Sequence, residues 1–169
     1  YEVVFGDWSS DVCSSDLNDP LARLAVYSIA NYRYLERFPA ELKIVHYSQA
    51  MEYRRESIRR EVLVGHNERR IALYRRFEAL FIEGIRRGQL RDDIDIPMAQ
   101  DLMTATYRQV AYLSLVLGDR PAAYYRAFCE HYLRSLCTRQ GLIRLAGTMK
   151  RIDDGSVNLP PLPERMFLC

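Results

Sequence analysis

The sequence predicts an all-α protein, and three observations support this prediction. Apolar residues recur at spacings of three and four from residue 19 to residue 140, which is the period of a helix with one buried face. No segment in this range reads as a strand. Prolines stand where helices would begin, at positions 20, 39, 97 and 121. We therefore expect a bundle of about five main helices over residues 19–37, 39–63, 66–88, 96–117 and 121–140.

The first two helices have the same kind of start signal. Asp19 supplies an N-cap acceptor, and Pro20 has the backbone angle that suits the first helical turn. Pro39 opens the second helix in the same way, and Glu41 is favourable in its first turn. We expect the first helix to end near residue 37 and the second near residue 63.

The third helix is bounded by residues that weaken or end helices. Gly65 and Asn67 interrupt the apolar pattern, so we expect a break there and a new helix over 66–88. Gly88 is the expected C-cap of this helix. The segment that follows, residues 88–96, reads GQLRDDIDI and is expected to be a turn.

The last two helices follow this turn. Asp95 and Pro97 are start signals for a helix over 96–117, which is the most apolar segment of the chain. Pro121 opens the final long helix, and Gly141 is its expected C-cap. Residues 142–169 are expected to form a short helix or a loose Pro-rich tail, because the prolines at 160, 161 and 163 forbid a regular helix.

Residues 1–17 lack the helical pattern and resemble a sequence that is not natural protein. Residues 7–17 read DWSSDVCSSDL, which resembles the translation of a widely used short-read sequencing adapter. We expect residues 1–17 to be a non-native, disordered segment, and residues 18–141 to form one helical domain. A natural surface loop rich in Ser and Asp is the alternative.

Charge and cysteine content suggest an ordinary intracellular domain. Four of the 22 acidic residues lie in the adapter-like segment, which leaves 24 Lys and Arg against 18 Asp and Glu. Outside that segment the cysteines are Cys129, Cys137 and Cys169, a sparse and odd set that suggests free thiols in the reducing cytoplasm. No run of 18 apolar residues is present, so we expect no membrane span.

Residues that could carry catalysis or bind metal are few and scattered. The histidines, His46, His66 and His131, are far apart in the sequence. Cys129 is followed by Glu130 and His131, but adjacent helical residues point in different directions and do not readily form a dyad. Glycine-rich phosphate loops and nucleophile elbows are absent from the sequence. We expect no catalytic residue, metal or cofactor, and a small helical enzyme is the least favoured alternative.

The basic doublets do not predict direct nucleic-acid binding. Arginine pairs at 54–55, 59–60, 69–70, 75–76 and 86–87 alternate with glutamates at 52, 56, 61, 68, 78 and 83. Such charges compensate one another on solvated helix faces. We therefore expect these helices not to contact DNA themselves.

The segment around residue 88 resembles a known family. Residues 79–95 read ALFIEGIRRGQLRDDID, which is similar to the junction "helix, G-x-[LI]-R-x-D-[IV]-D" common in the C-terminal domains of TetR-family transcriptional regulators. An apolar helix with an Asp-x-Pro start and a final amphipathic helix follow in the family's order. Residues 38–42, FPAEL, also resemble the family's fourth-to-fifth helix turn. The resemblance covers about residues 18–141.

This resemblance implies the effector-binding and dimerisation domain of a transcriptional repressor. In the family, a small molecule changes DNA binding by a helix-turn-helix head that precedes the sensor domain. That head is absent from this sequence, so DNA would be contacted only through the missing part. The ligand would act by shifting the population between two arrangements of the domain.

The resemblance also implies a homodimer in which the 96–117 and 121–140 helices pair with their mates. The apolar character of residues 104–117 agrees independently, because one small domain has few elements to cover them. From helix face and period we predict these dimer contacts: Leu102, Thr106, Val110, Leu113, Tyr125, Phe128, Tyr132 and Leu136.

Aromatic residues indicate where an effector would bind. All but one of the 12 tyrosines lie outside the adapter-like segment, and several fall within apolar helical patterns, where a buried hydroxyl needs a partner. Such groups favour a pocket for a small hydrophobic or aromatic effector. The predicted ligand-binding residues are Tyr27, Tyr32, Met51, Tyr74, Phe77, Met103 and Tyr107. The alternative is a helical protein-interaction module without a ligand, in which these side chains are simply core and interface.

Overall fold

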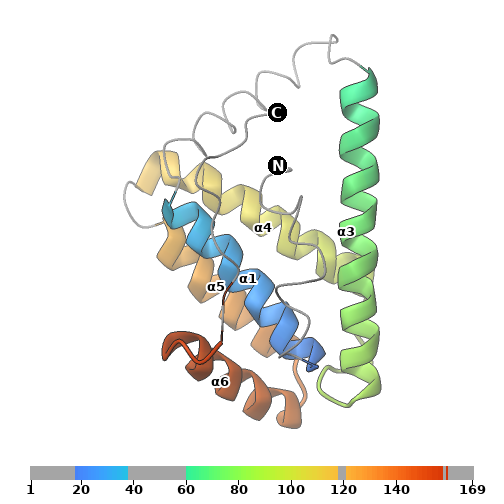
Figure 1. The fold of residues 1–169 in the computed structure, drawn as a ribbon, viewed down its shortest axis with the longest axis vertical. Coiled ribbons are helices and arrows are strands. Elements are labelled where there is room, and N and C mark those ends of the chain that lie inside the picture. The colour runs from blue at the N-terminus through green and yellow to red at the C-terminus, as the bar shows by residue number, and fades with distance from the viewer. Residues whose placement is uncertain (1–17, 38–59, 118–120, 158, 160–169) are drawn as a thin grey trace.

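The computed structural model is all-α over the residues that it describes, 18–37, 60–117, 121–157 and 159. Its helices are α1 (Pro20–Arg37), α3 (Arg60–Arg86), α4 (Ile96–Leu117), α5 (Pro121–Leu136) and α6 (Arg139–Asp153), shown in Figure 1. The predicted fold class is confirmed for these ranges. None of these helices combines the length and apolar composition needed to cross a bilayer. The adapter-like residues 1–17 and most of the predicted 39–63 helix lie outside the described residues.

Helix α1 lies at the centre of the bundle. It packs against α3, α5 and α6, and Figure 1 shows it lying along α5. The predicted start is confirmed, because the Asp19 carboxylate accepts the N–H of Ala22 at 3.0 Å. Residues 21–30 are almost entirely buried, including the polar Ser28. A helix that is apolar around most of its circumference needs neighbours on several sides, and α1 has them.

Helix α3 contradicts the predicted break at Gly65 and Asn67. It runs from Arg60 to Arg86 without interruption, so the predicted start at residue 66 is wrong. Glycine costs about 1 kcal/mol in a helix interior, and asparagine costs less. The intact backbone hydrogen bonding of a 27-residue helix outweighs such local preferences.

The predicted helix over 121–140 is two helices. Helix α5 ends at Leu136, and α6 begins at Arg139 after the N-cap Thr138, whose hydroxyl accepts the N–H of Gly141 at 3.1 Å. Gly141 is therefore in the first turn of α6 and is not the C-cap predicted for α5. A Cβ at this position would lie 1.9 Å from the carbonyl oxygen of Gln89, so the glycine is explained by close packing.

Helix α6 extends the core beyond the predicted domain boundary at residue 141. Leu145, Met149 and Ile152 on this helix and Val157 after it are buried in the same cluster as α1. Of the two alternatives predicted for residues 142–169, a short helix or a loose tail, the structure shows a helix up to Asp153, and residues up to Val157 pack on the domain.

The α3–α4 junction, residues 84–95, is a tightly bonded turn. Gly88 has a φ of 67°, a left-handed conformation that ends α3. The N–H groups of Gln89 and Leu90 both donate to the carbonyl of Gly84, at 2.9 and 3.1 Å. Leu90 is 1% exposed, and its side chain packs where a Cβ on Gly84 would be. Asp95 then accepts the N–H of Met98 at 3.0 Å and caps α4.

The same junction joins the turn between α5 and α6. The N–H of Arg91 donates to the carbonyl of Leu136, and the N–H of Thr138 donates to the carbonyl of Gln89, both at 3.0 Å. These bonds form an isolated β-bridge between Leu90 and Cys137. The Gln89 side chain donates to the Asp19 carboxylate at 3.0 Å, which adds the start of α1 to the same assembly. The junction is therefore a structural centre of the domain.

Candidate functional site

Three of the predicted ligand-binding residues pack together in the core. Tyr27 and Phe77 meet edge to face, with ring centroids 5.5 Å apart, and both are buried. Met103 is buried in the same cluster, and its sulfur lies 4.0 Å from the hydroxyl of Ser28. All three side chains belong to one buried cluster to which α1, α3 and α4 contribute. They do not line the described pocket, which lies closer to the surface.

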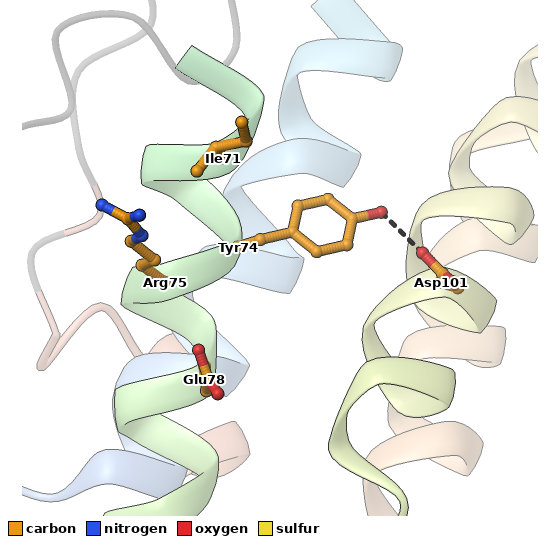
Figure 2. Close-up of a pocket in the computed structure, with 5 residues that line it drawn as sticks. All are labelled: Ile71, Tyr74, Arg75, Glu78 and Asp101. Carbon is orange, nitrogen blue, oxygen red and sulfur yellow. Dashed lines mark hydrogen bonds between the residues drawn. The ribbon is translucent and has the colours of Figure 1, made fainter. Parts of the chain in front are cut away.

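The α3–α4 pocket includes a fourth predicted residue, Tyr74. Its lining residues are Ile71, Tyr74, Arg75, Glu78 and Asp101, and its volume is about 250 Å³. Figure 2 shows Tyr74 reaching from α3 towards Asp101 on α4. The Tyr74 hydroxyl donates to Asp101 Oδ1 at 2.9 Å and lies 3.3 Å from the hydroxyl of Thr104. The remaining predicted ligand residues, the side chains of Tyr32 and Tyr107 and the whole of Met51, lie outside the described residues.

The charged lining of this pocket was not predicted as a site. Arg75 and Glu78 are exposed, and neither has a hydrogen bond or ion pair with another described residue. From the sequence, both residues are expected among compensating charges on a solvated helix face. The signal that could have separated them is their order, because an acidic residue that precedes a basic one along a helix pairs better than the reverse.

Glu83, farther along α3, shows the favourable order. Its carboxylate accepts hydrogen bonds from Arg86 and Arg87, each at 2.6 Å. These bonds, first that of Arg86, lower the pKa of Glu83 to about 2. Both charges of the Arg75–Glu78 pair remain available to a ligand, whereas those around Glu83 are already in use.

A second candidate surface is the α4–α5 face, formed by Met98, Leu102, Tyr124 and Phe128. Met98, Leu102 and Tyr124 are 58%, 50% and 53% exposed, and Phe128 is half-buried. The hydroxyl of Tyr132 donates to the carbonyl of Ala99 at 2.6 Å, which sets the register of the two helices. Figure 1 shows α4 and α5 running in opposite directions. Leu102 follows Ala99 by three residues and Phe128 precedes Tyr132 by four, so both are expected about one turn from that bond and at the same level. Exposed apolar side chains on adjacent helices are typical of an interface.

Two of the predicted dimer contacts are buried within their own chain. Tyr125 and Leu136 are only 1% and 7% exposed, because they point into the core of their own chain. The exposed aromatic residue is Tyr124, one position earlier, so the predicted face of α5 was rotated. Leu102 is exposed, Thr106 donates its hydroxyl to the Leu102 carbonyl, and Tyr132 stacks on Phe128 with ring centroids 5.6 Å apart. The side chains of Val110 and Leu113 lie outside the described residues.

The three residues considered as catalytic groups, Cys129, Glu130 and His131, lie in different environments. Cys129 is buried, and burial raises the pKa of its thiol to about 12. Glu130 instead pairs with Arg134 at 2.8 Å, while His131 is exposed. Within the described ranges no cluster of His, Cys, Asp and Glu is placed to hold a metal ion. The three neighbouring side chains thus do not meet at one point where they could act together.

Comparison with known proteins identifies no relative of this chain. No family model matches the sequence, no curated protein is significantly similar to it, and no solved structure matches its fold. The features that bear on function are therefore the pocket, the α4–α5 face and the junction.

Proposed function

We propose that this chain is the effector-binding and dimerisation domain of a TetR-like transcriptional repressor. In this proposal a small molecule with a hydrophobic or aromatic body binds between the helices of a cytoplasmic homodimer. Binding then alters how a helix-turn-helix head of the same regulator contacts DNA. The observation that carries the proposal is the α3–α4 junction, the segment through which the sequence resembles that family.

The residues of the resemblance have separate physical roles in the junction. Gly88 adopts a left-handed conformation, Leu90 fills the space beside Gly84, and Asp95 caps α4. A glycine, a leucine and an aspartate at this spacing are thus what this particular turn requires. The motif is a structural unit that orients two helices, which supports treating the resemblance as meaningful.

The α4–α5 face supports the homodimer. Exposed apolar side chains on two neighbouring helices lose unfavourable contact with water when a second copy covers them. A two-fold axis would bring the same residues of both copies together. Pairing of two helices from each copy would then build a four-helix interface.

Helix α4 offers a route from ligand to dimer. It contributes Asp101 to the pocket and the adjacent Leu102 to the α4–α5 face. A ligand that binds more tightly to one position of α4 relative to α3 would favour that position. The dimer geometry would change with it, because α4 also forms part of the α4–α5 face. The effect on DNA binding would come from this change in geometry.

Light scattering of the full chain over a range of concentrations tests the proposal. We expect a mass of two chains, and we expect Leu102→Glu to shift the equilibrium to the monomer. Ile82→Glu is the matched control, because Ile82 is 53% exposed but lies on α3, outside the α4–α5 face. A monomeric wild-type chain, or equal disruption by both variants, would contradict the proposal.

A protein-interaction module without a ligand is the second candidate. The packing of Tyr27 against Phe77 favours it, because these aromatic rings are used in the core and do not line the described pocket. Such a module would dimerise but would have no small molecule that raises its melting temperature. A ligand-bound sensor is stabilised by an amount that grows with the logarithm of the ratio of ligand concentration to dissociation constant.

A further inference from the structure

We propose that the α3–α4 pocket binds a small zwitterion, a molecule that carries an ammonium and a carboxylate group on an apolar body. The inference rests on the proposed function only where it identifies this molecule as the effector. The pocket and its charges stand independently of the family resemblance.

The size of the pocket limits the ligand. Sites for drug-sized molecules have volumes of roughly 300–1,000 Å³, and this pocket measures about 250 Å³. It also lies between exposed side chains and is not enclosed by the core. A ligand about the size of one amino acid suits it better than a long acyl chain or a fused-ring compound.

The charges of the lining favour a ligand that carries both a positive and a negative charge. Arg75 supplies one positive charge, and Glu78 and Asp101 supply two negative charges. A simple cation would leave the arginine unpaired beside it, and a simple anion would face two carboxylates. A zwitterion can pair with both signs, and the net negative charge of the lining makes its ammonium group the stronger contributor.

The placement of the charges suits a compact zwitterion. Arg75 and Glu78 are three residues apart on one helix, a spacing that puts their Cβ atoms roughly 5–6 Å apart. Neither is held by a hydrogen bond or ion pair with another described residue, so both side chains can turn towards a ligand. In Figure 2 Tyr74 and Asp101 face each other across the space between α3 and α4, Arg75 extends from the other side of α3, and Glu78 lies farther along that helix. The lining thus offers two carboxylates to an ammonium group and one guanidinium to a carboxylate group, once Arg75 and Glu78 turn towards the ligand.

The apolar body would rest on Ile71 and Tyr74. Ile71 is 49% exposed, so covering it removes apolar surface from water. The hydrogen bond from Tyr74 to Asp101 holds the tyrosine ring across the space between α3 and α4. A ring held in this way offers a flat surface for stacking, and we expect an aromatic zwitterion to bind better than an aliphatic one.

A matched series of three ligands tests the inference on the full chain. L-Phenylalanine, phenethylamine and 3-phenylpropanoate share the phenyl ring and differ in the charged groups they carry. We expect L-phenylalanine to shift the amide NMR signals of residues 71–78 and 101–104 and to bind about tenfold more tightly than either analogue, a difference of about 1.4 kcal/mol.

Charge variants assign the preference to residues. Arg75→Gln should remove the advantage of L-phenylalanine over phenethylamine, because no partner for the carboxylate remains. Glu78→Gln combined with Asp101→Asn should remove its advantage over 3-phenylpropanoate, while the asparagine keeps an acceptor for Tyr74. Arg76→Gln is the control, since it deletes an identical charge one residue outside the lining. Circular dichroism of each variant checks that the helices are retained.

The outcomes separate this inference from the proposed function. Equal binding of all three ligands, or no shift with L-phenylalanine, would overturn the inference. A dimeric chain without such binding would leave the proposed function standing, whereas a monomeric chain that prefers L-phenylalanine would support the pocket and contradict the dimer.

Discussion

Charged and polar groups are paired in one part of helix α3 and unpaired in another. At its C-terminal end, Glu83 binds two arginines, and the junction that follows bonds its backbone to Gly84, Leu136 and Thr138. About one to two turns earlier, in the α3–α4 pocket, Arg75 and Glu78 have no partner among the described residues. Both segments belong to the same helix and have similar composition.

The difference separates structure from binding. Groups that pair within the fold contribute to stability and have little left to offer a ligand. Unpaired charges and exposed apolar side chains lower the stability of the fold or do not contribute to it, so they are the better candidates for function. The junction therefore accounts for the fold and carries the family resemblance, while the pocket and the α4–α5 face are the surfaces where we propose binding.

The largest expected effect is in the core beside the junction. Phe81 is fully buried, and its neighbour Ile82 is 53% exposed. Phe81→Ala should lower the free energy of unfolding by about 3–5 kcal/mol, because it removes a buried ring and leaves a cavity. Ile82→Ala should change it by roughly 0.5 kcal/mol or less. Urea denaturation measures both, and similar losses would refute the assignment of these two faces.

A smaller loss is expected where α6 meets the junction. Gly141→Ala would place a Cβ 1.9 Å from the backbone oxygen of Gln89, so α6 must move; we expect a loss of about 1–3 kcal/mol. Gly147→Ala, on the same helix, meets no atom within 4 Å and should stabilise the protein by roughly 0.5–1 kcal/mol. Thermal melts of the two variants should therefore shift in opposite directions. A stabilising Gly141→Ala would show that α6 is not docked in this way.

The smallest expected effect comes from the ion pairs of Glu83 at the C-terminal end of α3. The pKa of Glu83 is lowered from 4.5 to about 2 in the fold, so its stabilising contribution is present above pH 4.5 and is lost as the pH falls towards 2. Glu83→Gln should flatten the dependence of stability on pH in this window, and salt should weaken the wild-type effect. Urea denaturation at several pH values in this window measures the dependence. The same dependence in the wild type and in Glu83→Gln would contradict the contribution of the Glu83 ion pairs.

The sequence was sufficient where local signals and packing agree. The Asp19–Pro20 start of α1 and the Asp95 cap of α4 were predicted and confirmed, because caps act within a few residues of their own helix. The break between α5 and α6 was missed because Gly141 reads as a C-cap, and only the neighbouring Gln89 backbone shows why a glycine is needed there. Contacts between distant segments have no such local signature.

The candidate site was only partly predictable for the same reason. Tyrosines in apolar patterns were recognised, yet the pattern does not say which of them face a pocket, and Tyr74 does so while Tyr27 lies in the core. The charged lining depends on which arginines and glutamates fail to pair. That outcome is set by helix crossing and side-chain geometry, not by spacing alone.

Amide hydrogen exchange of the full chain, at concentrations below and above the midpoint of dimerisation, tests the central claim most directly. We expect residues 98–106 and 124–132 to gain protection at the higher concentration, because the α4–α5 face becomes covered. Residues 84–91 and 136–141 should be protected equally at both, because the junction is closed within each chain. Concentration-dependent protection at the junction, or none on the α4–α5 face, would contradict the division between a closed structural centre and an open binding face.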